Sequence, residues 1–91
     1  MAATPLQKAL AALQVEIDAG YLYQQLSQLE DDPNLAETFR KLGAVEQRHA
    51  EHAWQKVQSQ GYTGAKPSVS GRARVLSWLG KRFGPQFVLP H

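Results

Sequence analysis

The sequence contains no cysteine, so neither a disulfide nor a thiolate metal site can stabilise this chain of 91 residues. A chain of this length buries only somewhat more than about 60% of the surface that its unfolded form exposes. The remaining means of stabilisation are self-association and a metal bound through nitrogen and oxygen ligands. No apolar run approaches the roughly 20 residues that cross a bilayer, and the start MAATPLQKAL lacks the features of a signal peptide. We therefore expect a cytoplasmic protein.

Acidic residues are absent from the last third of the chain. Residues 61–91 carry five Lys or Arg and no Asp or Glu, whereas residues 1–60 carry five Lys or Arg and eight Asp or Glu. The small net charge of +2 is therefore the sum of an acidic part and a basic part. An acidic body attracts cations, and a basic tail suits an anionic surface such as membrane lipid or nucleic acid.

Strand alternation is also absent, and the chain instead carries the end signals of helices. The sequence TPLQ at residues 4–7 combines a Thr cap, a Pro in the first turn and a Gln three residues after the cap, which predicts a helix from here to about Glu30. A second helix is predicted to begin at Asp32 or Asn34 and to run to about Gln60.

A third, shorter helix is predicted after the loop sequence GYTGAKPSVS. Ser68 or Ser70 would cap it, and a Gly-Pro pair that begins at Gly84 would end it. The chain thus divides into a helical hairpin over residues 1–62 and, over residues 63–91, a loop with a basic amphipathic helix.

Two long helices joined by a few residues pack antiparallel as a hairpin. A single hairpin cannot enclose a core, because each helix keeps an apolar face that its neighbour does not cover. A second copy is the simplest cover for these faces. The predicted fold class is all-α: an antiparallel helical hairpin plus a short C-terminal helix, which dimerises into a four-helix bundle.

Polar residues interrupt the predicted apolar stripes of both long helices. Spacings of three and four residues, typical of a seam that faces a neighbouring helix, occur in the second helix at Phe39, Leu42, Glu46, His49 and Ala53. The same spacings occur in the first helix at Leu6, Ala9, Leu13, Glu16, Gly20 and Tyr23. Two carboxylates and an imidazole are therefore expected in the core.

An ionised carboxylate without a partner is too costly to bury, so Glu16 needs a partner. One interpretation is an ion pair with Lys or Arg, although the basic residues of the second helix lie off the seam. Another is a protonated Glu16 hydrogen-bonded to His49. The third is a metal site, in which a dimer of hairpins collects four carboxylates and two imidazoles around two ions. Such ligands suit iron or manganese, and zinc is also compatible.

Glu16, Tyr23 and the motif E46-Q-R-H49 resemble the encapsulated ferritins and related half-bundle ferritin-like proteins, over about residues 6–60. The resemblance implies a ferritin-like four-helix bundle with a di-iron centre between two subunits, often assembled further into a ring. The implied activity is the oxidation of Fe(II) to Fe(III) by oxygen or peroxide, a ferroxidase reaction in iron storage or detoxification. Glu16, Glu46 and His49 would bind the metal, and Tyr23, as a candidate catalytic residue, would hydrogen-bond beside it.

Two further residues are candidates for an auxiliary metal site. The family has additional acidic positions around the first-helix glutamate, where this chain has Val15 and Asp18. Asp18 is thus the one remnant of such a site. His52 lies one turn beyond His49 and could form a His-x-x-His pair with it, whereas Glu51 is expected on the surface.

The basic third helix permits several roles. Its apolar residues can share a face, comprising Val69, Ala73, Leu76, Leu79 and Phe83, while Arg72, Arg74, Lys81 and Arg82 supply charge. Such a helix could lie on a membrane, or dock against its own bundle or a neighbouring dimer. Nucleic acid is not expected, because no reader motif accompanies the five basic residues.

This tail also resembles the connector of membrane-bound ferritins, in which a vacuolar-iron-transporter-like membrane domain follows. That resemblance implies an alternative function, a cytoplasmic iron-sensing or iron-delivery module of a membrane iron transporter without sustained turnover. It places the domain on the cytoplasmic face of a membrane. The encapsulin lumen is another expected location, although no tail like those of encapsulin cargo is present.

Overall fold

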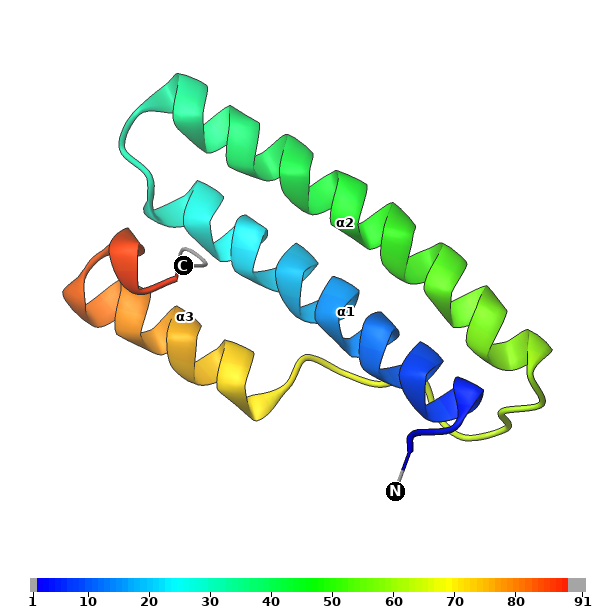
Figure 1. Ribbon diagram of the computed structural model, residues 1–91. Helices are drawn as coiled ribbons and strands as arrows, with labels where there is room; N and C mark the ends of the chain where they lie inside the picture. The colour runs from blue at the N-terminus through cyan, green and yellow to red at the C-terminus, as the bar shows by residue number, and fades with distance from the viewer. Residues whose placement is uncertain (1, 89–91) are drawn as a thin grey trace.

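The computed structural model describes residues 2–88, and within that range it is all-helical, without strands (Figure 1). This confirms the predicted helical class and the three predicted helices. The elements are α1 (Pro5–Leu29), α2 (Pro33–Ser59) and α3 (Gly71–Phe83), followed by a 3-10 turn, η1 (Pro85–Phe87). None of the helices in residues 2–88 is both long and apolar enough to cross a membrane.

Local capping residues fix where each helix starts. Thr4 forms the predicted capping box: its hydroxyl accepts from the Gln7 amide (3.1 Å), and its own amide donates to Gln7 Oε1 (2.8 Å). Asp32 caps α2 by accepting from the amide of Asn34 at 2.9 Å. Ser70 caps α3. The structure thereby selects Asp32 over Asn34 as the cap of α2, and Ser70 over Ser68 as the cap of α3.

Helix α1 lies between the other two helices (Figure 1). Helix α2 runs antiparallel to it, as the short connection requires, and α3 runs alongside its other flank. Leu35 and Leu42 of α2 are 40% exposed, and the side chain of His49 is 54% exposed, so the side of the hairpin that carries these residues is its open face.

Two buried clusters hold the hairpin together, one toward each end. The first contains Leu13, Ala50 and Val57, and the second contains Leu26, Phe39 and Val88. The side chains of Leu13, Leu26 and Val57 are at most 1% exposed. Full burial of one such side chain stabilises a fold by about 1.5–3 kcal/mol, so these clusters supply much of the packing energy.

Between the clusters, two buried glycines let α1 and α2 approach closely. A Cβ on Gly43 would lie 3.4 Å from the Gly20 carbonyl oxygen and 3.4 Å from Tyr23 Cβ. A Cβ on Gly20 would lie 3.4 Å from Cγ of Gln47. The space at this crossing therefore admits a methyl group in ordinary contact but no larger side chain.

The predicted seam of α2 is partly wrong in its phase. Phe39 is buried as predicted, but Leu42 is 40% exposed and the side chain of His49 is 54% exposed, so both lie at the edge of the interface with α1 rather than inside it. The buried residues of α2 are Phe39, Gly43, Ala50 and Val57. Small residues at the crossing, which carry little weight in a count of large apolar side chains, rotate the helix so that Leu42 and His49 lie on the open face.

Helix α3 docks on α1 through polar contacts and small residues. The amide and hydroxyl of Ser70 donate to the two oxygens of Asp18 (2.9 and 2.6 Å), and the buried hydroxyl of Ser77 donates to Gln25 Oε1 (3.0 Å). Ala73 and Gly80 are also buried on this side. Docking against the chain's own hairpin, one of the predicted roles of the helix, is thus present.

The predicted apolar face of α3 is partly wrong. Phe83 does not share the buried side with Ala73; it is 56% exposed and contacts the ring of Trp78 edge-on, with ring centroids 6.3 Å apart. The reason is that small residues, rather than the largest apolar ones, allow α3 to lie close against α1.

Candidate metal centre

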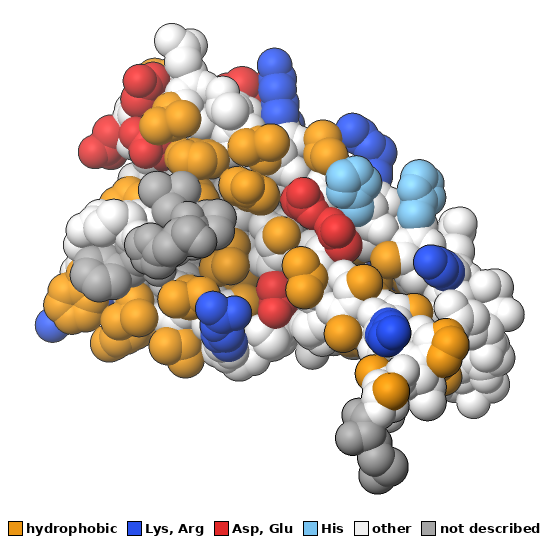
Figure 2. Space-filling model, viewed as in Figure 1, with side chains coloured by type: hydrophobic (Ala, Val, Ile, Leu, Met, Phe, Trp, Pro, Cys, Tyr) orange, Lys and Arg blue, Asp and Glu red, His pale blue; other side chains and the backbone are white. Residues whose placement is uncertain are grey.

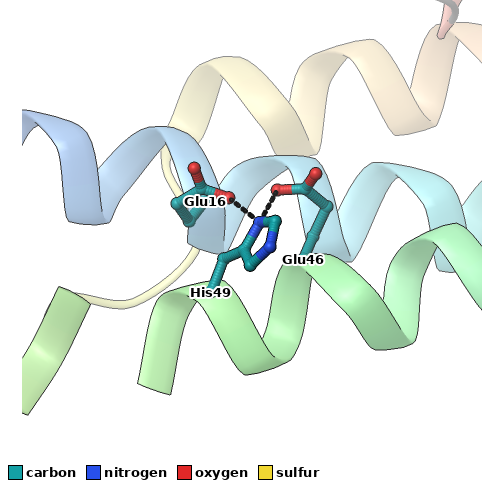
Figure 3. A group of neighbouring side chains, drawn as sticks. All are labelled: Glu16, Glu46 and His49. Carbon is teal, nitrogen blue, oxygen red and sulfur yellow. Dashed lines mark ion pairs between the residues drawn. The ribbon is translucent and has the colours of Figure 1, made fainter. Parts of the chain in front are cut away.

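Three side chains converge at the middle of the hairpin. Glu16 projects from α1, and Glu46 and His49 project from successive turns of α2, so that all three point toward one another (Figure 3). The Nδ1 atom of His49 lies 3.5 Å from Glu16 Oε2 and 3.8 Å from Glu46 Oε2. Each residue offers one ligand atom, and these atoms all lie within 4.8 Å of one another. The structure thus brings together the three predicted metal ligands.

The two carboxylates are shielded from water more than the imidazole. The exposed fraction is 29% for the Glu16 side chain, 24% for Glu46 and 54% for His49. Within residues 2–88, Glu16 Oε2 is the one buried side-chain oxygen or nitrogen that lacks a hydrogen-bond partner. A buried acceptor without a donor costs about 1–3 kcal/mol, and more when charged, which is the condition that a bound cation relieves.

Basic side chains do not neutralise this pair of carboxylates. Among residues 2–88, no Lys or Arg forms an ion pair with either of them; the acid–base pairs join Glu37 to Arg40 and Glu51 to Lys66. Of the three interpretations of the buried glutamate, the ion pair with Lys or Arg therefore finds no support in the described part of the chain.

The pKa of Glu46 is raised above its usual value of 4.5. The main cause is a hydrogen-bonding interaction with Glu16, which a protonated Glu46 can make and an ionised one cannot; burial and the charge of Glu16 add to it, and His49 opposes it. Without a cation, Glu46 therefore keeps its proton to a higher pH than an isolated glutamate does. A metal ion would displace that proton.

The raised pKa predicts how the stability of the metal-free protein depends on pH. Because folded Glu46 binds a proton more tightly than unfolded Glu46, its contribution to stability is present below pH 4.5 and is lost as the pH rises through the folded pKa. The variant Glu46→Gln has no carboxyl group at this position, so it does not lose this stability as the pH rises. We expect the variant to gain stability relative to the wild type as the pH rises from pH 4 to pH 7.

Urea unfolding of both proteins in the presence of a chelator, at each pH, measures this difference. Glu37, whose pKa Arg40 lowers, is present in both proteins and cancels from the comparison. If the difference in the free energy of unfolding between the variant and the wild type is the same at pH 4 and pH 7, the prediction is wrong.

The geometry of the three side chains fits one end of a metal site. Bonds of about 2.0–2.2 Å from a metal to nitrogen or oxygen place neighbouring ligand atoms about 3 Å apart. The observed separations of 3.5 and 3.8 Å approach this value, so small side-chain rotations suffice. Three ligand atoms leave coordination positions open for water, for substrate, or for side chains of another copy.

The other predicted site residues lie outside this group. Tyr23 stacks on Phe39 in the second buried cluster, with ring centroids 6.3 Å apart, and its catalytic role stays a prediction. Both oxygens of Asp18 accept hydrogen bonds from Ser70, so the carboxylate anchors α3. His52 is exposed. An auxiliary metal site at Asp18 or His52 stays a prediction, and the anchoring role of Asp18 was missed.

Apolar side chains surround the site on the open face. Leu35, Leu42 and His49 follow one another at intervals of seven residues along one side of α2, and both leucines are 40% exposed. Val15, next to Glu16 on α1, is 65% exposed. Figure 2 shows acidic and histidine side chains next to one another with hydrophobic side chains around them. The group of Glu16, Glu46 and His49 thus lies within a partly apolar surface.

A scan of protein-family models and searches of curated proteins and of solved structures matched nothing. The assignment of the site therefore rests on three observations made above. These are the convergence of the ligand atoms, the buried oxygen of Glu16 without a hydrogen-bond partner, and the absence of a basic partner among residues 2–88. Together they favour a cation site over a closed hydrogen-bond network.

Proposed function

We propose that two copies of this chain pack open face to open face as a ferritin-like four-helix bundle and oxidise Fe(II) to Fe(III) at a site they share. The observation that carries the proposal is the group of Glu16, Glu46 and His49, whose ligand atoms lie within 4.8 Å of one another and include the buried Oε2 of Glu16. This group offers half of the ligands that a two-metal carboxylate site in a helical bundle uses. A twofold mate supplies the other half.

Charge balance supports a pair of divalent ions. Each chain brings two carboxylates and one imidazole, so a dimer brings four negative charges, which two divalent cations neutralise. Without cations, four carboxylates would crowd together at the dimer interface. Metal binding and dimerisation should therefore favour one another. Oxygen-rich ligands with imidazole are suited to iron, and also to manganese.

The exposed apolar residues support the dimer. Leu42, one turn of α2 from Glu46, is 40% exposed, Val15, next to Glu16, is 65% exposed, and Leu35 at the start of α2 is 40% exposed. Burial of this surface against a second copy would contribute to association, because the free energy gained scales with the apolar area removed from water. It would also exclude water from the metal ligands, which strengthens their electrostatic interaction with the ions.

In the proposed reaction the Fe(II) ions are substrates. Each ion gives up one electron, so a pair supplies the two electrons that reduce oxygen to hydrogen peroxide, or hydrogen peroxide to water, with protons taken from solvent. The glutamates hold the ions side by side and balance the charge that increases on oxidation. His49 contributes a neutral nitrogen ligand from the more exposed side of the site.

An anaerobic titration of the full chain with Fe(II), followed by admission of air, tests the proposal. We expect saturation at one Fe(II) per chain, a dimer in sedimentation velocity that iron stabilises, and oxidation faster than in protein-free buffer. Binding without faster oxidation would instead support the iron-sensing or iron-delivery module. Absence of saturable binding would contradict both functions.

A further inference from the structure

Helix α3 presents a second apolar surface, away from the metal centre. Its buried side, with Ala73, Ser77 and Gly80, rests on α1, so its opposite side points outward. On that outward side Val75 is 57% exposed and Trp78 is 58% exposed. Two large apolar side chains thus lie exposed to solvent on a helix that is already docked.

Basic residues surround these apolar side chains. Arg72, Arg74, Lys81 and Arg82 are all exposed, and the chain from residue 61 onward contains no acidic residue. None of the four forms an ion pair with an acidic side chain in the described part of the structure. Hydrophobic and basic side chains lie next to one another over α3 in Figure 2. Helix α3 therefore combines an outward Trp and Val with four exposed positive charges, of which Arg74 lies on the flank of the helix, where it also lines a pocket against α1 and α2.

We propose that this outward surface of α3 binds an anionic lipid membrane, with Trp78 and Val75 entering the headgroup region and the four basic residues contacting lipid phosphates. A Trp at the level of the headgroups and Arg or Lys beside it are typical of helices that lie in the interface plane. The surface lies on the opposite side of α1 from α2, so membrane binding leaves the hairpin between the two long helices intact.

Charge complementarity selects a membrane over a second copy of this surface. A twofold contact between two α3 helices would bring the same four cations of each copy against one another, and like charges disfavour such a contact. An anionic bilayer offers negative charge to the basic residues and an apolar layer to Trp78 at the same time.

Vesicle sedimentation tests the proposal with the full chain. We expect binding to vesicles of 70% phosphatidylcholine and 30% phosphatidylserine in low salt, and little binding to phosphatidylcholine alone. Lys81→Gln combined with Arg82→Gln should lower the partition coefficient about 30-fold, which corresponds to about 1 kcal/mol for each basic residue. Trp78→Ser should lower it at least about tenfold.

A matched control is available on α2. Lys41→Gln combined with Arg48→Gln changes the net charge equally, but both residues are exposed on a different helix, so binding should fall much less. Circular dichroism verifies that each variant is folded. The proposal is overturned if the wild type does not bind the anionic vesicles, or if both double variants bind equally. It is also overturned if Trp78→Ser abolishes a lipid-free oligomer in sedimentation velocity while vesicle binding persists.

Discussion

Glu46→Gln is expected to lower the rate of Fe(II) oxidation by at least about 100-fold. Loss of a residue that merely supports a metal ligand commonly costs 10–100-fold in affinity or activity, and loss of the ligand itself should cost more. Glutamine keeps the size of the side chain but removes one negative charge from each half of the shared site. It also relieves the repulsion from Glu16 that the metal-free protein suffers.

The matched control for this variant is Glu51→Gln. Glu51 lies on the same helix, is exposed, and pairs with Lys66 at 3.8 Å rather than with the ligand group. The Glu51→Gln variant should bind and oxidise Fe(II) like the wild type when the anaerobic titration is followed by admission of air. If Glu46→Gln oxidises Fe(II) as fast as Glu51→Gln, the group does not carry out the reaction.

Gly43→Leu is expected to destabilise the protein by about 3 kcal/mol, near the upper end of the cost of overpacking a core. A Cβ at this position already lies 3.4 Å from the Gly20 oxygen and from Tyr23 Cβ, so the further carbons of leucine must push α1 and α2 apart. Glu46 is one turn along α2 from Gly43, and Glu16 is one turn along α1 from Gly20. The same separation should therefore weaken metal binding.

Gly43→Ala provides the comparison. Its methyl group would make contacts of 3.4–3.5 Å, which are ordinary van der Waals distances, and alanine favours the helix over glycine by up to about 1 kcal/mol. This variant should be as stable as the wild type or slightly more stable in urea unfolding followed by circular dichroism. Equal stability of the leucine and alanine variants would show that the packing of α1 against α2 does not depend on the small size of Gly43.

The helix ends could be predicted from the sequence because their causes are local. The capping box of Thr4 and Gln7 depends on residues three apart, and it forms as predicted. The cap of α3 is different. Ser70 was one of two candidates, and the structure holds it by a carboxylate 52 residues away, that of Asp18. No pattern within a single helix contains that contact, so the anchoring role of Asp18 could not be predicted from the sequence.

The phase of the seam between α1 and α2 could not be predicted because small residues determine it. A count of large apolar side chains favours Leu42, whereas the structure buries Gly43 and Ala50. The convergence of Glu16, Glu46 and His49 was nevertheless predictable. Glu16 and Glu46 interrupt apolar stripes, and a rotation that exposes His49 still leaves the three side chains within reach of one another.

The burial of Val88 has a practical consequence for labelling this protein. Its side chain is 2% exposed, packs in the second cluster with Leu26 and Phe39, and lies where a Cβ on Gly80 would meet it. The amino end is different, since Ala2 is exposed ahead of the capping box. A fluorophore intended for counting subunits is therefore better attached at Ala2 than at Val88, because an attachment at Val88 would disrupt the packing of the second cluster.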